Sequence, residues 1–348
     1  RYNAIDIAKW RSDYHKIPLV LGSATPTFET YARSLKGVYK LLTLPKRVND
    51  AKLPVVKVVD MAEEAKCRSM VLSRYLKERL QERLEAQEQS ILLLNRRGFG
   101  TLVSCSACGY TFKCPNCDIT LTFHKSSNAL RCHYCGYFLK KPALCPECKM
   151  PEIKDAGLGT EKLEEQLHKI YPEARIVRMD ADTTSKKGSH EKIIQDFKEE
   201  KYDILLGTQM ISKGLDFPKV TLVGVISADA SLNIPDFRSG ERTFALLSQV
   251  AGRAGRSGLE SEVVIQTYNP DNFTIKMVEM GTFLKNYQYE MSIRKKLKYP
   301  PYYYLVGIKV CSKVYEDASI EATKVYQHLK ATIDTESIIL GPTTAGVF

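Results

Sequence analysis

The middle of the chain alternates between short apolar blocks and longer amphipathic segments. Each apolar block is long enough for one buried strand, and the blocks lie at 91–94, 175–179, 203–207, 220–226 and 263–266. Apolar residues with helical spacing lie between the blocks, at 70–88, 160–170, 193–197 and 241–253. Continuously apolar strands that alternate with helices predict a parallel sheet covered on both faces. In such a sheet, functional groups gather at the carboxyl ends of the strands.

The two ends of the chain do not follow this alternation. An early apolar block at 18–22 predicts a short strand, and 28–35 predicts a helix after it. Residues 45–54 carry two prolines and mixed charges, which is typical of a linker. Near the other end, 305–310 and 338–340 predict two strands around a helix at 318–332. The last part of the chain is therefore predicted to be a small α+β unit.

Composition places the chain among globular proteins. Of its 348 residues, 44% are hydrophobic and 26% are charged, which is enough apolar material to build cores. The sequence contains no run of roughly 18 apolar residues, so we expect no membrane span. The net charge of +11 favours a polyanionic partner without naming it. The sequence starts at Arg1 without a signal segment, from which we expect a piece of a longer protein.

Eight of the ten cysteines form four Cys-x-x-Cys pairs inside the alternating region. Two such pairs can hold one tetrahedral Zn²⁺ ion, so eight thiolates predict two closed, structural zinc sites. A disulfide scaffold would instead require an oxidising compartment. In a nested arrangement, Cys105, Cys108, Cys145 and Cys148 form the first site, and Cys114, Cys117, Cys132 and Cys135 form the second.

The nested arrangement would let a cysteine module enter and leave its host domain at one point. Sequential pairing along the chain is the alternative. His124 and His133 lie among the pairs and could each replace a thiolate. Aromatic and basic residues of the module could cover the metal sites or form a surface for DNA or protein.

Polar motifs follow several of the predicted strands. Ser-Ala-Thr occupies 23–25, Thr-Gln-Met-x-x-Lys-Gly-x-Asp occupies 208–216, and Gln-x-x-Gly-Arg-x-Gly-Arg occupies 249–256. In this order they resemble motifs III, V and VI of superfamily 2 helicases. Four further features point to one family among these helicases. They are the inserted cysteines, Asn-Arg-Arg-Gly at 95–98, Asp-Thr-Thr at 182–184 and Tyr-Pro-Pro-Tyr at 299–302. The chain resembles the C-terminal half of the replication-restart primosomal helicases of bacteria.

This resemblance implies a fold class and a division into domains. The fold class is α/β, with a RecA-like parallel-sheet helicase lobe into which a two-zinc cysteine-rich module is inserted. Residues 1–50 would be the end of the first helicase lobe, and 51–102 with 151–270 would form the second. The zinc-binding module would occupy 103–150, and a C-terminal α+β domain would occupy 271–348.

The resemblance also implies roles for individual residues. ATP and Mg²⁺ would bind between the two lobes of the full-length protein, with Arg256 as arginine finger beside Arg253 and Gln249. Residues that couple the nucleotide to movement of the lobes would be Ser23, Thr25, Gly214 and Asp216. Candidate DNA contacts are Thr208, Arg96, Arg97 and Thr184. Surface solvation or helix capping is the alternative role for each of these residues.

The implied activity is that of an ATP-dependent 3′–5′ DNA helicase that recognises stalled or forked DNA and initiates primosome assembly for replication restart. Its partners would be forked and single-stranded DNA, single-strand-binding protein, and other primosome and replicative-helicase loading proteins. It would act in the bacterial cytoplasm at the nucleoid.

Two motifs of such helicases do not occur in this sequence. The phosphate-binding pattern Gly-x₄-Gly-Lys-[Ser/Thr] and the acidic Asp-Glu-x-His box are both missing, so we expect the chain alone not to hydrolyse ATP. The alternative function is a zinc-ribbon adaptor that binds nucleic acid or protein without motor activity. A third possibility is an RNA helicase, because the motor motifs do not separate DNA from RNA.

Overall fold

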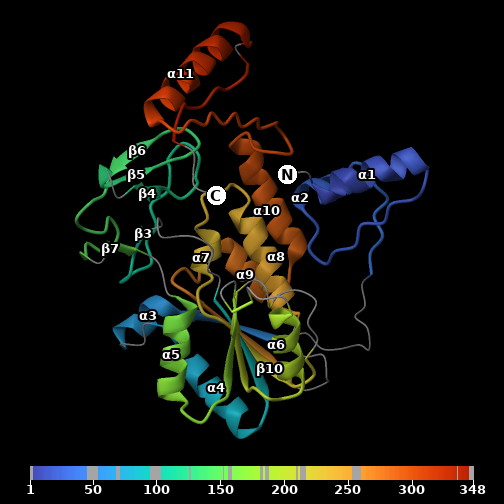
Figure 1. The fold of residues 1–348 in the computed structure, drawn as a ribbon, viewed down its shortest axis with the longest axis vertical. Coiled ribbons are helices and arrows are strands. Elements are labelled where there is room, and N and C mark those ends of the chain that lie inside the picture. Colours follow the sequence, from blue (N-terminus) through green and yellow to red (C-terminus); the bar gives the residue numbers. More distant parts are fainter. Residues whose placement is uncertain are drawn as a thin grey trace. The chain divides into compact units, whose positions relative to one another are not determined.

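A computed structural model gives the fold of the chain (Figure 1). The residues that it describes are 3–44, 54–67, 71–94, 103–124, 127–151, 153–155, 159–180, 183–184, 188–208, 211, 217–252, 260–334 and 336–344. The chain divides into two compact units, Arg1–Leu42 and Thr43–Phe348.

The first unit contains two helices, α1 (Ala4–His15) and α2 (Phe28–Leu35). The side chain of Thr27 caps α2 by accepting a hydrogen bond from the backbone N–H of Thr30, and Phe28 and Ala32 are buried. The helix predicted at 28–35 is therefore confirmed. The strand predicted at 18–22 is not formed. A strand needs a neighbour for its backbone groups, and the described residues of this unit contain no other strand.

The second unit is built on a parallel sheet of six strands, which confirms the predicted fold class. The strand order is β1 (Val55–Asp60), β11 (Glu262–Thr267), β10 (Val220–Val225), β2 (Gln89–Leu93), β9 (Ile204–Gly207) and β8 (Ile176–Met179). The strand β1 was not predicted, because it follows directly on the segment that has linker composition.

Helices cover both faces of this sheet, because alternate side chains of each strand point to opposite faces. Ile91 and Leu93 of β2 pack in one core with α6 (Ser189–Lys198), α8 (Ser239–Ala251) and α9 (Phe273–Glu279). Leu92 packs in the other core with α4 (Arg74–Glu85) and α5 (Thr160–Ile170). The short helices α3 (Met61–Lys66) and α7 (Asp229–Leu232) complete this α/β domain.

The cysteine module lies between β2 and α5 in the sequence. Two antiparallel strands, β3 (Val103–Cys105) and β7 (Ile153–Asp155), pair where the chain enters and leaves it. A small antiparallel sheet of β4 (Thr122–His124), β5 (Ala129–Arg131) and β6 (Phe138–Lys140) forms its centre. The module has a hydrophobic core of its own, to which five of the eight paired cysteines contribute as buried residues.

After the sheet, the chain forms α10 (Phe283–Lys296) and later α11 (Tyr315–Thr332). The helix predicted at 318–332 is confirmed. The strands predicted at 305–310 and 338–340 are not formed, and Val306 there is 86% exposed. Neither segment has a paired strand among the described residues, so its backbone cannot form a ladder. Within the described part of the chain, none of the helices combines the length and the apolar character that a membrane crossing requires.

Candidate functional sites in the cysteine module and at the sheet edge

Each Cys-x-x-Cys pair forms the same tight turn. The first cysteine of a pair accepts a hydrogen bond at its carbonyl from the backbone N–H four residues later, and its own N–H donates to the carbonyl five residues later. The fourth residue after the first cysteine has positive φ in all four turns, and these residues are Gly109, Asp118, Gly136 and Lys149. Glycine adopts this conformation without strain, whereas Asp118 and Lys149 do not. The four turns direct the sulfurs inward in pairs.

The eight sulfurs form two groups of four in the nested arrangement. We call Cys105, Cys108, Cys145 and Cys148 the outer cysteine site, and Cys114, Cys117, Cys132 and Cys135 the inner cysteine site. Sulfurs of opposite pairs lie 3.5–3.7 Å apart. Four sulfurs around one Zn²⁺ ion with bonds of about 2.3 Å would be separated by about 3.8 Å. The geometry therefore fits one tetrahedral zinc ion in each site.

Burial also changes the ionisation of one thiol in each site. Burial raises the pKa of Cys108 to about 12 and that of Cys114 to about 11. At neutral pH these thiols would keep their protons unless a bound cation stabilises the thiolates. The imidazole rings of His124 and His133 pack 5.2 Å apart and belong to neither group of four.

The carboxyl edge of the sheet carries two of the predicted DNA contacts. Thr208 follows β9, and its backbone N–H donates to the carbonyl of Met179 in β8, 3.3 Å away. The half-buried Thr184 lies in the turn after β8, and its hydroxyl donates to the carbonyl of Asp180. The predicted contacts Arg96 and Arg97 follow β2 in the sequence but lie outside the described residues.

Asp180 organises this edge. Burial opposes its ionisation, but bonds from the Thr183 backbone N–H and the Thr160 hydroxyl, together with the charge of Arg178, hold its pKa below the ordinary value. The hydroxyl of Thr160 in the first turn of α5 lies 2.9 Å from the Asp180 carboxylate. The start of α5 is thereby fixed to the end of β8.

The predicted nucleotide-site residues lie at and after the end of α8. Gln249 is exposed in the last turn, while Val250 beside it is buried in the core. Arg253 and Arg256, and the predicted coupling residues Gly214 and Asp216, lie outside the described residues. In the first unit, the hydroxyl of Ser23 accepts a hydrogen bond from the backbone N–H of Thr25, so these two predicted coupling residues form one turn.

The inner cysteine site contacts the α/β domain through Tyr299, a residue of the Tyr-Pro-Pro-Tyr motif, in a way that the sequence did not predict. The hydroxyl of Tyr299 donates to the carbonyl of Cys117, 2.9 Å away, and its ring stacks on Phe237 with centroids 4.8 Å apart. Gly109 of the outer site approaches Tyr268 so closely that a Cβ at position 109 would lie 2.1 Å from the Cβ of Tyr268. A side chain at this position would therefore separate the module from the domain.

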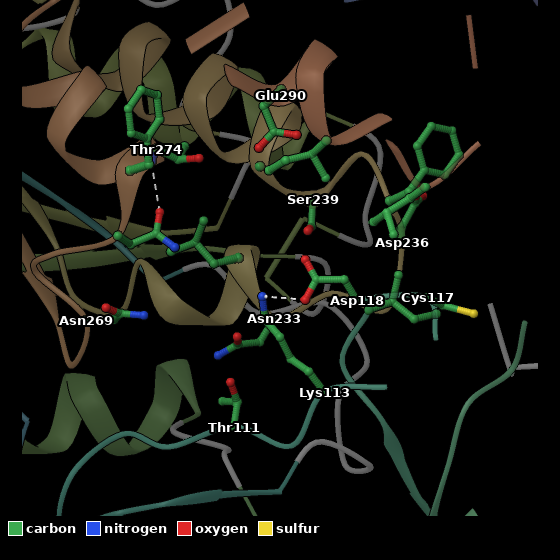
Figure 2. A pocket seen from close by; sticks show the side chains of 18 of the residues that line it. Thr111, Lys113, Cys117, Asp118, Asn233, Asp236, Ser239, Asn269, Thr274 and Glu290 are labelled. Carbon is green, nitrogen blue, oxygen red and sulfur yellow. Dashed lines mark hydrogen bonds and ion pairs between the residues drawn. The ribbon is translucent and has the colours of Figure 1, made fainter. Parts of the chain in front are cut away.

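A polar cavity of about 170 Å³ lies between the module and the α/β domain (Figure 2). Lys113 and Asp118 line it from the module and form an ion pair of 3.3 Å. Glu290 of α10 lines it from the domain and packs against Gly240, where a Cβ would lie 2.1 Å from the Glu290 carboxylate. Burial raises the pKa of Glu290 to about 7.

Matches to known protein families give the class of the α/β domain, which is helicase-like. Residues 152–258 match the helicase conserved C-terminal domain, and residues 114–138 match the PriA DNA helicase Cys-rich region (CRR) domain.

Similarity to individual proteins extends over the whole chain. The chain is 50% identical over 349 residues to Replication restart protein PriA of Bacillus subtilis (strain 168). This alignment covers 100% of this chain and 43% of that protein. The identity to Replication restart protein PriA of Chlamydia muridarum (strain MoPn / Nigg) is 42% over 351 residues, which covers 100% of this chain and 47% of that protein. These matches confirm the resemblance to the replication-restart primosomal helicases. The chain spans less than half the length of these two relatives.

The solved structures that align with the chain are more distant in sequence. The structure of RecG bound to a three-way DNA junction aligns with a TM-score of 0.46 and 15% identity, covering 87% of this chain and 30% of that chain. Dbp5 of S. cerevisiae bound to RNA and ADP BeF3 aligns with a TM-score of 0.40 and 15% identity, covering 82% of this chain and 56% of that chain.

Proposed function

We propose that this chain is the C-terminal part of an ATP-dependent 3′–5′ DNA helicase that acts at stalled or forked DNA and initiates primosome assembly. The observation that carries the proposal is the 50% identity to a replication restart protein over the whole chain. The partners would be forked and single-stranded DNA, single-strand-binding protein and the other primosome and replicative-helicase loading proteins. The place of action would be the bacterial cytoplasm at the nucleoid.

In this proposal, the domain division follows the sequence. Residues 1–50 end the first helicase lobe, 51–102 and 151–270 form the second lobe, 103–150 form the zinc module, and 271–348 form the C-terminal domain. In this proposal, Thr208 and Thr184 at the carboxyl edge of the sheet contact DNA, and Arg96 and Arg97, which lie outside the described residues, would do so too. Hydroxyl and guanidinium groups of this kind bind phosphate oxygens and set the position of the strand without reading its sequence.

Gln249, Arg253 and Arg256 would form the contribution of this chain to ATP hydrolysis. Guanidinium groups stabilise the negative charge that develops on the transferring phosphoryl group, and Arg256 is proposed as the arginine finger. Ser23, Thr25, Gly214 and Asp216 would couple the nucleotide state to movement. ATP and Mg²⁺ also need the phosphate-binding loop that this sequence lacks, so the chain alone would not hydrolyse ATP.

The metal sites have a structural role in this proposal. The outer and inner cysteine sites would each hold one Zn²⁺ ion through four thiolates, which leaves no position for a substrate or a water molecule. The ions would supply the folding free energy of the module, whose strands are only three residues long.

The test is an Arg256→Ala substitution in the full-length protein. An arginine finger contributes about 10³-fold or more to the rate of hydrolysis. We expect DNA-stimulated ATP hydrolysis to fall by that amount while the affinity for forked DNA is unchanged. Arg242→Ala is the control, because Arg242 is an arginine of α8 whose partner is Asp236, 2.7 Å away. Ordinary hydrolysis in the Arg256 variant would remove the assignment.

ATP hydrolysis by the full-length wild-type protein, measured with DNA and with RNA, distinguishes the proposed function from the two alternative functions. A zinc-ribbon adaptor without motor activity would bind DNA or protein but hydrolyse no ATP. Because this chain matches the helicase conserved C-terminal domain over 152–258, the adaptor is less well supported. An RNA helicase would be stimulated by RNA in preference to DNA.

A further inference from the structure

A continuous series of contacts joins the inner cysteine site to the first turn of α8. Tyr299 bonds to the carbonyl of Cys117 and stacks on Phe237, as described above. The guanidinium of Arg294 lies over the ring of Phe237, 5.1 Å from its centroid. Arg294 forms an ion pair of 2.5 Å with Glu241, which belongs to the first turn of α8.

The ion pair at the end of this series is buried. The side chain of Arg294 is 1% exposed and that of Glu241 is 9% exposed. Removing one partner of a buried pair leaves an uncompensated charge, so such a pair holds its two elements in a fixed geometry. It therefore fixes α10, which carries Arg294, to the start of α8.

A second aromatic residue of the inner site strengthens the contact. Tyr134, within the Cys132–Cys135 turn, packs against Tyr299 with ring centroids 6.3 Å apart. The backbone N–H of Phe237 also hydrogen-bonds to Tyr134. Both tyrosines thus meet Phe237, two residues before α8 begins.

These contacts matter because the module and the α/β domain have separate hydrophobic cores. A polar cavity lies beside the contact, lined by Asp118, Asp236, Ser239 and Glu290 among others (Figure 2). The aromatic and ionic contact, together with the close approach of Gly109 to Tyr268, therefore sets the position of the module, because the described residues of the two parts form separate apolar cores.

We propose that Tyr299, Phe237 and the Arg294–Glu241 pair are positioning residues that hold the inner cysteine site on the first turn of α8. A displacement of α8 would then also displace the zinc module. The helix has 13 residues and a length of about 20 Å, with Gln249 in its last turn. A regular helix of this length moves as a rod, so a shift at the nucleotide end reaches the module. This inference rests on the proposed function.

The contact itself can be tested on this chain by hydrogen exchange. Tyr299→Phe removes the hydroxyl that bonds to Cys117 and keeps the ring, and Tyr299→Ala removes both. We expect the phenylalanine variant to exchange amides of 111–121 and 237–244 about fivefold faster, as for the loss of one hydrogen bond, and the alanine variant to exchange them faster still. Unchanged exchange in both segments would overturn the proposal.

Tyr171→Phe provides a matched control. Tyr171 is also buried, and its hydroxyl donates to the carbonyl of Lys77, 2.8 Å away, on the α4–α5 side of the sheet. This control loses the same kind of hydrogen bond, so it should leave exchange in 111–121 and 237–244 unchanged. Zinc content measured on every variant checks that both metal sites remain filled.

The consequence for function is measured on the full-length protein as base pairs separated per ATP hydrolysed. We expect Tyr299→Ala to keep ATP hydrolysis within twofold of wild type and to lower this ratio about tenfold, while Tyr299→Phe recovers part of it. Hydrolysis and unwinding that fall in parallel, or a ratio that stays unchanged, would overturn the positioning role. A wild-type protein that hydrolyses ATP without separating strands would instead contradict the proposed function.

Discussion

Glu290, which lines the cavity between the cysteine module and the α/β domain, should make the stability of the protein depend on pH. Burial against Gly240 raises the pKa of its carboxyl from the ordinary value of 4.5 to about 7, so the folded state holds the proton more tightly than the unfolded state. Below pH 4.5 the carboxyl of Glu290 is protonated in both states, so its burial does not lower the free energy of unfolding. Between pH 4.5 and 7 the unfolded state ionises first, and the free energy of unfolding decreases as the pH rises.

The magnitude follows from the size of this shift. Each pKa unit corresponds to 1.36 kcal/mol, so the full loss above pH 7 is at most about 3 kcal/mol, reduced by the water that reaches this half-buried group. Glutamine has the same shape and no charge. We therefore expect Glu290→Gln to gain stability over wild type by about 2 kcal/mol between pH 5.5 and pH 8.5.

The assay is urea unfolding of both proteins at several pH values between 5.5 and 8.5, with zinc present throughout. Glu279→Gln is the control, because Glu279 is an exposed residue at the end of α9. A constant difference between Glu290→Gln and wild type across this range would refute the reasoning, since it would mean that Glu290 has the same pKa in both states.

Two further predictions concern the module. In the nested arrangement, a Cys105→Ser/Cys145→Ser double variant should retain one zinc ion per chain and Cys105→Ser/Cys114→Ser none, as measured by mass spectrometry of the metal; sequential pairing would give the opposite result. Gly109→Ala should lower the free energy of unfolding by more than the 1 kcal/mol or so expected for positive φ alone, because the methyl group would also meet Tyr268. A loss equal to that of Gly136→Ala, where the nearest atom is 3.8 Å away, would argue against this contact.

The central sheet could be predicted from the sequence because its signal is local. Each of β2, β9 and β10 contains mostly apolar residues and is buried along its whole length, although β2 begins with the polar residues Gln89 and Ser90. The last part of the chain shows that a local signal is not sufficient to predict a strand. The segment 305–310 has strand composition, but a strand also requires a partner, which no local pattern supplies.

The candidate sites divide in the same way. The cysteine sites follow from spacing, because each turn is local and four turns complete two sites. The contact of Tyr299 with Cys117 and Phe237 joins residues that are far apart in the sequence. Its tyrosine lies in the Tyr-Pro-Pro-Tyr segment, which supported the family resemblance but did not predict this contact. Likewise α10 was missed, because the buried positions of this helix include the polar residues Asn286 and Arg294.

The pairing of β1 with β11 has a consequence for the order in which the protein forms during synthesis. β1 is an edge strand that hydrogen-bonds to β11, and Val55 pairs with Glu262. Roughly 200 residues must leave the ribosome between these partners, which takes about 10–40 s at 5–20 residues per second. The cysteine module closes its own strands within 103–155 and can take up metal much earlier. The nascent chain would then carry a completed zinc module before β11 has been synthesised and β1 can pair with it.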